Sequence, residues 1–325
     1  MSNKPLFTIT SSMLLRCTQI TKLLGKYEGL MSPKPQPLLR RQNRIRTIRD
    51  SLAIEGNSLT MDQVSTIFDG KRVVGLKREI LEVVNAIKVY EEAPNLDPLS
   101  SKSLRKAHGI LMGGLIDDTG KWRATDVGIL KGSKVSHLAS RARLVPELMD
   151  GLFDFVKKGN DIHALIKSSI FHYELEFIHP FSDGNGRMGR LWQHVILLKF
   201  HPLFENIPVE SIIKAHQKKY YEVLEKSDRK GDCSPFIDFS LEVILEGLQE
   251  FLEALRPEPV TVETRLEKAT IHFEKKRFSR KEYLNFFKSL STATASRDLQ
   301  YGVEKKLLRK FGDKALARYI FLVSP

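Results

Sequence analysis

"HPFSDGNGRMGR", residues His179–Arg190, brings a histidine, a carboxylate, a glycine-rich turn and two arginines together within twelve positions. Pro180 disfavours helical backbone at the residue before it, so a helix that enters this stretch ends at His179. Gly184 and Gly186 allow a sharp turn with unobstructed backbone N–H groups, and a new helix begins there. The stretch therefore predicts a helix, a loop and a second helix, in a chain whose patterning is mainly helical.

The predicted loop has the features of a phosphate site. A helix N-terminus presents free N–H groups and the positive end of its dipole. Arg187 and Arg190 are three residues apart, so they share one helix face and can bind further phosphate oxygens. Asp183 is an oxygen ligand suited to Mg²⁺, and His179 can accept a proton near neutral pH. Together they indicate transfer of a phosphorus centre from a Mg²⁺-nucleotide to an alcohol.

Each of these residues alone is usually structural or solvated, and only their conjunction favours chemistry. The conjunction is similar to the Fic family motif, H-P-F-x-(D/E)-G-N-G-R-x-x-R, which the stretch matches at every specified position. The resemblance implies a Fic fold, a mainly α helical bundle with a β-hairpin flap. It also implies a nucleotidyltransferase that moves AMP from ATP to a Ser, Thr or Tyr hydroxyl of a protein and releases pyrophosphate.

The resemblance also assigns roles to individual residues. His179 is expected to be the general base, and Asp183 to hold Mg²⁺ between the α- and β-phosphates of the ATP substrate. The other nucleotide and phosphate contacts are expected at Phe181, Gly184, Asn185, Gly186, Arg187 and Arg190. The family's flap aligns a target segment by strand addition. The residues expected to do this are Thr125, Asp126, Val127, Gly128, Ile129 and Leu130.

A second stretch, "SLAIEGN" at Ser51–Asn57, predicts control of this activity. Ser51 and Glu55 are four residues apart, hence on one face of a helix that ends at the following glycine. The stretch is similar to the inhibitory pattern (S/T)-x-x-x-E-(G/N) of many Fic proteins, which implies an inhibitory helix over about residues 37–56. The family then pairs this glutamate with the second motif arginine, here Arg190, so the γ-phosphate loses its donors. In some relatives the glutamate positions water to remove AMP, so a reverse activity stays open.

The C-terminal fifth of the chain carries most of the excess positive charge. From Val260 onward there are 15 lysines and arginines against 7 aspartates and glutamates, in a chain of net charge +13. Three helical segments and two strands around Gly312-Asp313 resemble a winged helix-turn-helix, with a recognition helix at Thr294–Leu299. The candidate nucleic-acid contacts are Arg297, Lys305 and Lys306. A protein-interaction module with a solvated basic face is the alternative.

Three regions are expected along the chain. Two prolines interrupt helix at Arg256–Val260, which favours a hinge there, and helix is expected before it from about Pro208 to Leu255. The regions are an N-terminal helical region with the inhibitory helix (1–95), a Fic core with following helices (96–257), and the winged helix-turn-helix module (258–325).

The sequence also gives an expectation for the cellular compartment. No apolar run of about 18 residues occurs, so no membrane span is expected, and the N-terminus lacks the pattern of a secretory signal. The two cysteines, Cys17 and Cys233, are far apart in sequence and fit buried thiols in a reducing cytoplasm. A cytoplasmic protein is therefore expected.

The favoured hypothesis is an autoinhibited protein adenylyltransferase; its target is left open, and the protein itself is one candidate. One alternative is a DNA-binding transcription regulator whose Fic core senses nucleotide. Another is a Fic enzyme that removes AMP or transfers a different phosphate-containing group. Relatives often pair through the Fic core, so a homodimer is a further hypothesis.

Overall fold

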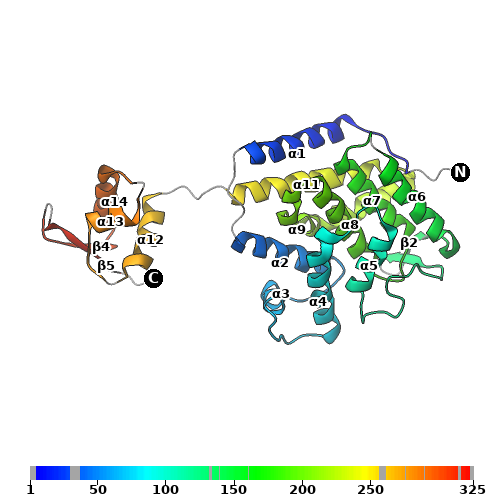
Figure 1. The fold of residues 1–325 in the computed structure, drawn as a ribbon, viewed down its shortest axis with the longest axis horizontal. Helices are drawn as coiled ribbons and strands as arrows, with labels where there is room; N and C mark the ends of the chain where they lie inside the picture. Colours follow the sequence, from blue (N-terminus) through cyan, green and yellow to red (C-terminus); the bar gives the residue numbers. More distant parts are fainter. Residues whose placement is uncertain are drawn as a thin grey trace. The chain divides into compact units, whose positions relative to one another are not determined.

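The chain forms two compact units, residues 1–255 and 256–325, and its fold is mainly helical, as predicted (Figure 1). The computed structural model describes residues 5–29, 37–131, 134–138, 140–159, 161–255, 261–274, 276–288, 290–313 and 316–322. The predicted hinge at 256–260 lies outside these residues. In the described part of the chain, no helix is both long and apolar enough to cross a bilayer.

Unit 1 is a helical bundle with one β-hairpin. Its strands β1 (Gly128–Lys131) and β2 (Lys134–Leu138) pair antiparallel. Short 3₁₀ helices lie at Ala93–Asn95, Ala142–Leu144 and Pro202–Asn206. The α-helices are α1 (Ser11–Gly29), α2 (Pro37–Ile54), α3 (Met61–Phe68), α4 (Lys77–Glu92), α5 (Ser101–Leu111), α6 (Val145–Lys158), α7 (Ala164–Ile178), α8 (Asn185–Phe200), α9 (Val209–Ala215), α10 (Gln217–Lys230) and α11 (Ser234–Ala254).

The helical structure expected from about Pro208 to Leu255 is confirmed, and it consists of the three helices α9, α10 and α11. Gly231 ends α10 with φ of 60°, a left-handed conformation that glycine adopts without steric cost. Pro235 then lies in the first turn of α11, where its missing N–H leaves no intrahelical bond unmade.

The pair α7–α8 lies between two hydrophobic clusters and contributes to both. Phe171 and Leu175 of α7 pack with Trp192 of α8 in the cluster that α2, α4, α5 and α6 complete. Ile170 and Tyr173, on the other side of α7, pack in the cluster built with α1, α9, α10 and α11. A helix that is apolar on most sides is fixed by its neighbours. The loop that joins α7 to α8 is therefore held at both ends by buried helices.

Helix α2 ends in a tight glycine turn. Gly56 has φ of 96°, its N–H donates to the Ala53 carbonyl at 3.3 Å, and the N–H of Asn57 donates to Leu52 at 3.2 Å. This pair of bonds is a Schellman motif, which satisfies the last carbonyls of a helix. Glu55 therefore lies just past the last helical residue rather than within the helix.

Three arginines of α2 form ion pairs with neighbouring elements. Arg41 pairs with Asp69 after α3, Arg44 with Glu205 in a 3₁₀ helix, and Arg46 with Glu250 of α11. Each pair is partly exposed and worth little alone. Together they fix the orientation of α2 against three different elements.

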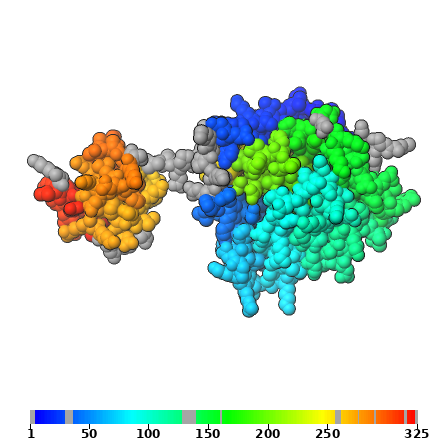
Figure 2. Space-filling model, viewed as in Figure 1, coloured from blue at the N-terminus to red at the C-terminus, as the bar shows by residue number. Residues whose placement is uncertain are grey.

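Unit 2 has its own hydrophobic core, and Figure 2 shows the outer face of both units in atomic detail. The structure adds one short strand to the two that were predicted, and the sheet order is β3-β5-β4 with antiparallel pairs. The elements are α12 (Val262–Phe273), β3 (Phe278–Ser279), α13 (Arg280–Phe286), α14 (Thr292–Glu304), β4 (Leu308–Phe311) and β5 (Arg318–Phe321).

A buried ion pair joins α12 to α14 in this core. Nε and Nη2 of Arg265 donate to the two carboxylate oxygens of Asp298 at 2.6 and 2.7 Å, and the Tyr283 hydroxyl donates to the same carboxylate at 3.2 Å. The Asp298 side chain is 1% exposed. Removing one partner of such a pair leaves an uncompensated buried charge.

Replacing Asp298 with alanine is expected to destabilise unit 2 by about 3–5 kcal/mol, enough to unfold a unit of this size. Both tryptophans, Trp122 and Trp192, lie in unit 1. Tryptophan fluorescence therefore follows unit 1, whereas far-UV circular dichroism follows both units. The Asp298→Ala protein should lose helical dichroism at low denaturant while its fluorescence transition stays unchanged.

The matched control is Asp313→Ala, which removes an exposed ion pair with Lys310 and should leave both signals as in the wild type. An Asp298→Ala protein with unchanged dichroism would contradict the role given to the buried pair.

Candidate functional site

His179 caps the end of α7 in the left-handed conformation, with φ of 55° and ψ of 59°. A residue other than glycine rarely adopts this backbone conformation without support from its surroundings. Its Nδ1 donates to the Glu176 carbonyl at 3.2 Å, so Nε2 is the ring nitrogen that carries the lone pair. The structure therefore places a basic nitrogen at the start of the loop, on a ring that is partly exposed.

Arg123 provides that support, and the sequence analysis did not identify it. Its Nε donates to the His179 carbonyl at 2.6 Å, and its backbone N–H donates to the Pro180 carbonyl at 2.9 Å. The same guanidinium donates to Thr125 at 2.8 Å and to Ser140, on either side of the hairpin. Burial lowers the pKa of Arg123. One buried side chain thus joins the base of the hairpin to the backbone of His179.

The loop itself is closed by side chains packed beneath it. Asn185 accepts from the Phe181 N–H and donates to the Phe181 carbonyl, both at 2.9 Å. The Phe181 ring is fully buried and stacks on His108 with centroids 3.7 Å apart. Gly184 has φ of 84°, and a Cβ there would lie 2.8 Å from Sδ of Met112. The Phe181 side chain therefore anchors the loop, and its contact with nucleotide stays a prediction.

His108 is a second residue that the sequence analysis missed. Nε2 donates to the Asp183 carbonyl at 3.0 Å, and Nδ1 accepts from the Gly120 N–H at 2.8 Å. The bond that Nδ1 accepts requires a neutral ring, and burial lowers the pKa of His108, which keeps it neutral. His108 thus fixes the backbone of the residue expected to bind metal.

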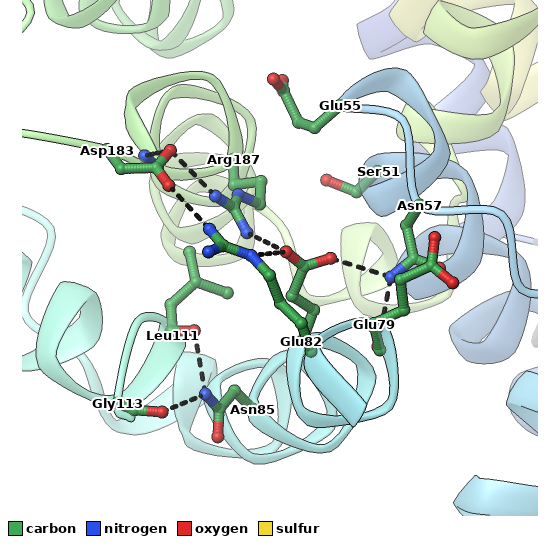
Figure 3. A network of polar contacts seen from close by, with 12 residues as sticks. Ser51, Glu55, Asn57, Glu79, Glu82, Asn85, Leu111, Gly113, Asp183 and Arg187 are labelled. Atoms are coloured by element: carbon green, nitrogen blue, oxygen red, sulfur yellow. Dashed lines mark hydrogen bonds and ion pairs between the residues drawn. The ribbon is translucent and has the colours of Figure 1, made fainter. Parts of the chain in front are cut away.

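Two carboxylates and two arginines form a network at the start of α8 (Figure 3). Oδ1 of Asp183 accepts from Nη2 of Arg187 at 3.2 Å, and Oδ2 lies 3.4 Å from Nη2 of Arg78. Nη1 of Arg187 lies 3.6 Å from Oε1 of Glu82. Arg78 and Glu82, both on α4, carry no motif signal in the sequence.

Arg190 is held by the end of α2. Nη2 donates to Oε1 of Glu55 at 2.7 Å and to the Ser51 carbonyl at 3.1 Å, while Nε donates to the Ser51 hydroxyl at 3.2 Å. The Arg190 side chain is 1% exposed. A Cβ at Gly186 would lie only 2.4 Å from Oε1 of Glu55. The Glu55 carboxylate therefore covers the first turn of α8, where a helix attracts an anion.

The polar groups of the site suit a phosphate ligand with one metal ion. Among the described residues, Nε of Arg187 and Nη1 of Arg190 are buried donors without a hydrogen-bond partner, which a phosphate oxygen would satisfy. Asp183 is partly exposed, and the described residues hold no cluster of three or more metal-ligating side chains. A single carboxylate fits Mg²⁺, which takes its other ligands from water and substrate phosphates.

A buried polar chain lies beneath this site. Oε1 of Glu176 bonds the Tyr220 hydroxyl at 3.1 Å, and that hydroxyl bonds Nε2 of His172 at 3.0 Å. Burial, together with the negative charge of Glu55, raises the pKa of Glu176 to about 7. Burial lowers the pKa of His172 to about 3, so the imidazole is neutral.

Comparison with known proteins decides the family. Residues 98–197 match the protein-family model of the Fic/DOC family. The crystal structure of a Fic family protein from Desulfovibrio desulfuricans G20 is 36% identical in sequence, with a TM-score of 0.76, over 99% of this chain and 99% of that chain. The chain belongs to the Fic family.

The Fic chain is also similar to curated proteins. It is 28% identical over 242 residues to "Protein adenylyltransferase Fic" of Nematostella vectensis, covering 70% of this chain and 53% of that protein. It is 26% identical over 269 residues to "Protein adenylyltransferase fic-1" of Caenorhabditis elegans, covering 78% of this chain and 49% of that protein. The chain spans about half the length of the curated relatives it matches.

A solved structure of Caenorhabditis elegans Fic-1 is similar in fold, with 21% identity and a TM-score of 0.60 over 75% of this chain and 73% of that chain.

The structure brings together the predicted site residues of α2, its glycine turn and the motif. Ser51, Glu55 and the motif from His179 to Arg190 meet at the α7–α8 loop. Of the predicted flap residues, 125–127 precede strand β1, and 128–130 lie within it. The side chains of 128–130 lie outside the described residues. Unit 2 carries the remaining three, Arg297, Lys305 and Lys306, all exposed.

The raised pKa of Glu176 predicts a pH dependence of stability for this Fic protein. In the unfolded chain the carboxyl ionises near its ordinary pKa of 4.5, whereas in the folded protein it holds its proton to about 7. The contribution of Glu176 to the free energy of unfolding is therefore fully present at low pH and is lost as the pH rises through this range. Glu176→Gln keeps the bond to Tyr220 and cannot ionise, so at about pH 8 it should be more stable than the wild type, on the order of 2 kcal/mol.

Urea unfolding of both proteins between about pH 5 and pH 8 measures this difference. Glu222→Gln, at an exposed position on α10, is the control and should follow the wild type. Parallel pH curves for wild type and Glu176→Gln would show that Glu176 is ionised throughout and would contradict the prediction.

Proposed function

We propose that this Fic protein is an adenylyltransferase that moves AMP from ATP to a Ser, Thr or Tyr hydroxyl of a protein, and that Glu55 restrains it. One observation carries the proposal: a carboxylate of the chain itself occupies the anion position over Gly186 and takes a donor of Arg190. The names of the curated relatives support the same activity. The target is a protein of unspecified identity, with self-modification included.

The chemistry follows from the positions of the motif residues. Nε2 of His179 accepts the proton of the target hydroxyl, whose oxygen attacks the α-phosphorus of ATP. The bond from that phosphorus to the oxygen bridging the α- and β-phosphates breaks, and pyrophosphate leaves. Arg187 and Arg190 stabilise the negative charge on the leaving phosphates. Asp183 would hold Mg²⁺, which when bound neutralises phosphate charge.

The restraint is electrostatic and steric at once. Arg190 is almost wholly buried, and its Nη2 and Nε already bond Glu55 and Ser51. A γ-phosphate at the same place would need those donors and would meet the Glu55 carboxylate at van der Waals distance. Two like charges cannot share this site at low cost, so productive ATP binding requires Glu55 to move.

Replacing Glu55 with glycine is expected to raise labelling of protein by α-labelled ATP at least about tenfold, because Arg190 regains its donors for the γ-phosphate. Replacing His179 with alanine in the Glu55→Gly protein should abolish labelling, because the base is removed. Mass spectrometry of the labelled protein should find the mass of one AMP on a hydroxyl side chain.

Equal labelling of wild type and Glu55→Gly would contradict the restraint. A different mass increment would show that the enzyme transfers another phosphate-containing group. Loss of AMP from modified protein that requires Glu55 would show that the enzyme also works in reverse.

We also propose that unit 2, as a winged helix-turn-helix, binds duplex DNA. Arg297 on α14, Lys305 and Lys306 after it, and Arg309 on β4 are exposed, and none pairs with a carboxylate among the described residues. By contrast, Lys310 pairs with Asp313. Unpaired cations on one helix and the adjacent strand are the electrostatic pattern of a phosphate-binding face.

The full-length protein is expected to shift random duplex DNA at low salt, with an affinity that falls as salt rises. The logarithm of the binding constant falls linearly with the logarithm of the salt concentration. Replacing Arg297, Lys305 and Lys306 together with alanine should lower the magnitude of this slope by about 0.9 for each DNA phosphate that the protein no longer neutralises. Lys310→Ala, which removes a paired lysine, should change it little. Absence of a shift by the wild type at low salt would favour a protein-interaction module.

A further inference from the structure

Glu82 on α4 is a carboxylate that the proposed reaction does not use, although it lies within the site (Figure 3). Its Oε1 lies 3.6 Å from Nη1 of Arg187 and 3.6 Å from Nε of Arg78, and its side chain is 14% exposed. Its Oε2 accepts from Nδ2 of Asn57 at 2.9 Å. One carboxylate thus faces a motif arginine on one side and the turn that follows Glu55 on the other.

Arg187 needs a partner of this kind. Its side chain is 7% exposed, and a guanidinium at this depth is stable only when its charge is compensated. Among the described residues, the other carboxylate that pairs with it is Asp183. Asp183 is also the residue expected to hold Mg²⁺, so its oxygens would be shared with the metal. Glu82 would remain as a partner of Arg187 that is not shared with the metal.

Asn57 orients Glu82 from the opposite side. Its own N–H closes the glycine turn by donating to the Leu52 carbonyl, and its Nδ2 also donates to the Glu79 carbonyl at 3.2 Å. The amide is therefore fixed by both α2 and α4. Because the turn holds Asn57 and Asn57 holds Glu82, the position of the turn and that of Arg187 are linked through two contacts.

We propose that Glu82 is a positioning residue that holds the Arg187 guanidinium for the nucleotide's phosphates and joins it to the turn that carries Glu55. This inference rests on the proposed function. Each motif arginine is then held by a carboxylate from the N-terminal region, Arg190 by Glu55 after α2 and Arg187 by Glu82 on α4. Glu55 must leave Arg190 before ATP binds, whereas Glu82 stays with Arg187 throughout.

The decisive measurement is nucleotide affinity in the Glu55→Gly background, where the restraint is absent. Glu82→Gln keeps the size of the side chain and an acceptor for Asn57, but it removes the charge that faces Arg187. The Kd of a non-hydrolysable ATP analogue should rise about tenfold, with kcat at saturating ATP within about threefold. The matched control is Glu79→Gln, whose carboxylate bonds Ser58 at 2.9 and 3.0 Å in the same turn. It should leave the Kd within about twofold.

A double-mutant cycle separates positioning from a general structural role. Once Arg187 is replaced with glutamine, Glu82→Gln should have no further effect on Kd, because the group that it positions is gone. The same four proteins, unfolded without nucleotide, should show that the two substitutions are less destabilising together than the sum of their single effects.

An unchanged or tighter Kd in Glu82→Gln, an equal effect of Glu79→Gln, or additivity with Arg187→Gln would overturn the proposal. Failure of the Glu55→Gly protein to bind the analogue at all would contradict the proposed function instead. The unfolding cycle needs no nucleotide, and it then decides by itself whether Glu82 holds Arg187.

Discussion

The N-terminus of α8 attracts negative charge, and the structure depends on which negative charge occupies it. The helix lies between the two clusters of unit 1, so its position cannot adjust to a ligand. Gly186 has no side chain, and the space over it is filled by the Glu55 carboxylate. Everything that places Glu55 there, from the ion pairs of α2 to its glycine turn, therefore acts on the site. The contact between Glu55 and Arg190 is thus part of the candidate site and also the basis of the proposed restraint.

The sequence predicted the part of the site whose contacts are local. The end of α7 at His179, the turn at Gly184 and the arginines of α8 lie within one short stretch, and the restrictions imposed by Pro180 and the glycines act on their immediate neighbours. The pairing of Glu55 with Arg190 spans 135 residues, and only the resemblance to Fic proteins indicated it. The mainly helical fold followed from the spacing of apolar residues.

The residues that the sequence analysis missed all act across long separations. Arg123 bonds a carbonyl 56 residues further along the chain, and His108 bonds one 75 residues further. Such contacts are made to backbone oxygens, which leave no pattern of residue types to detect. Glu82 sits on an ordinary amphipathic helix, where a carboxylate is normally solvated.

The close approach of Glu55 to Gly186 has a quantitative consequence. A competitor that belongs to the same chain has an effective concentration fixed by the geometry of its tether. The nucleotide, by contrast, arrives from solution at whatever concentration the surroundings supply. In the proposed enzyme, the fraction of sites free of Glu55 would therefore depend on the nucleotide concentration relative to the effective concentration of Glu55. Dilution of the protein would leave that fraction unchanged.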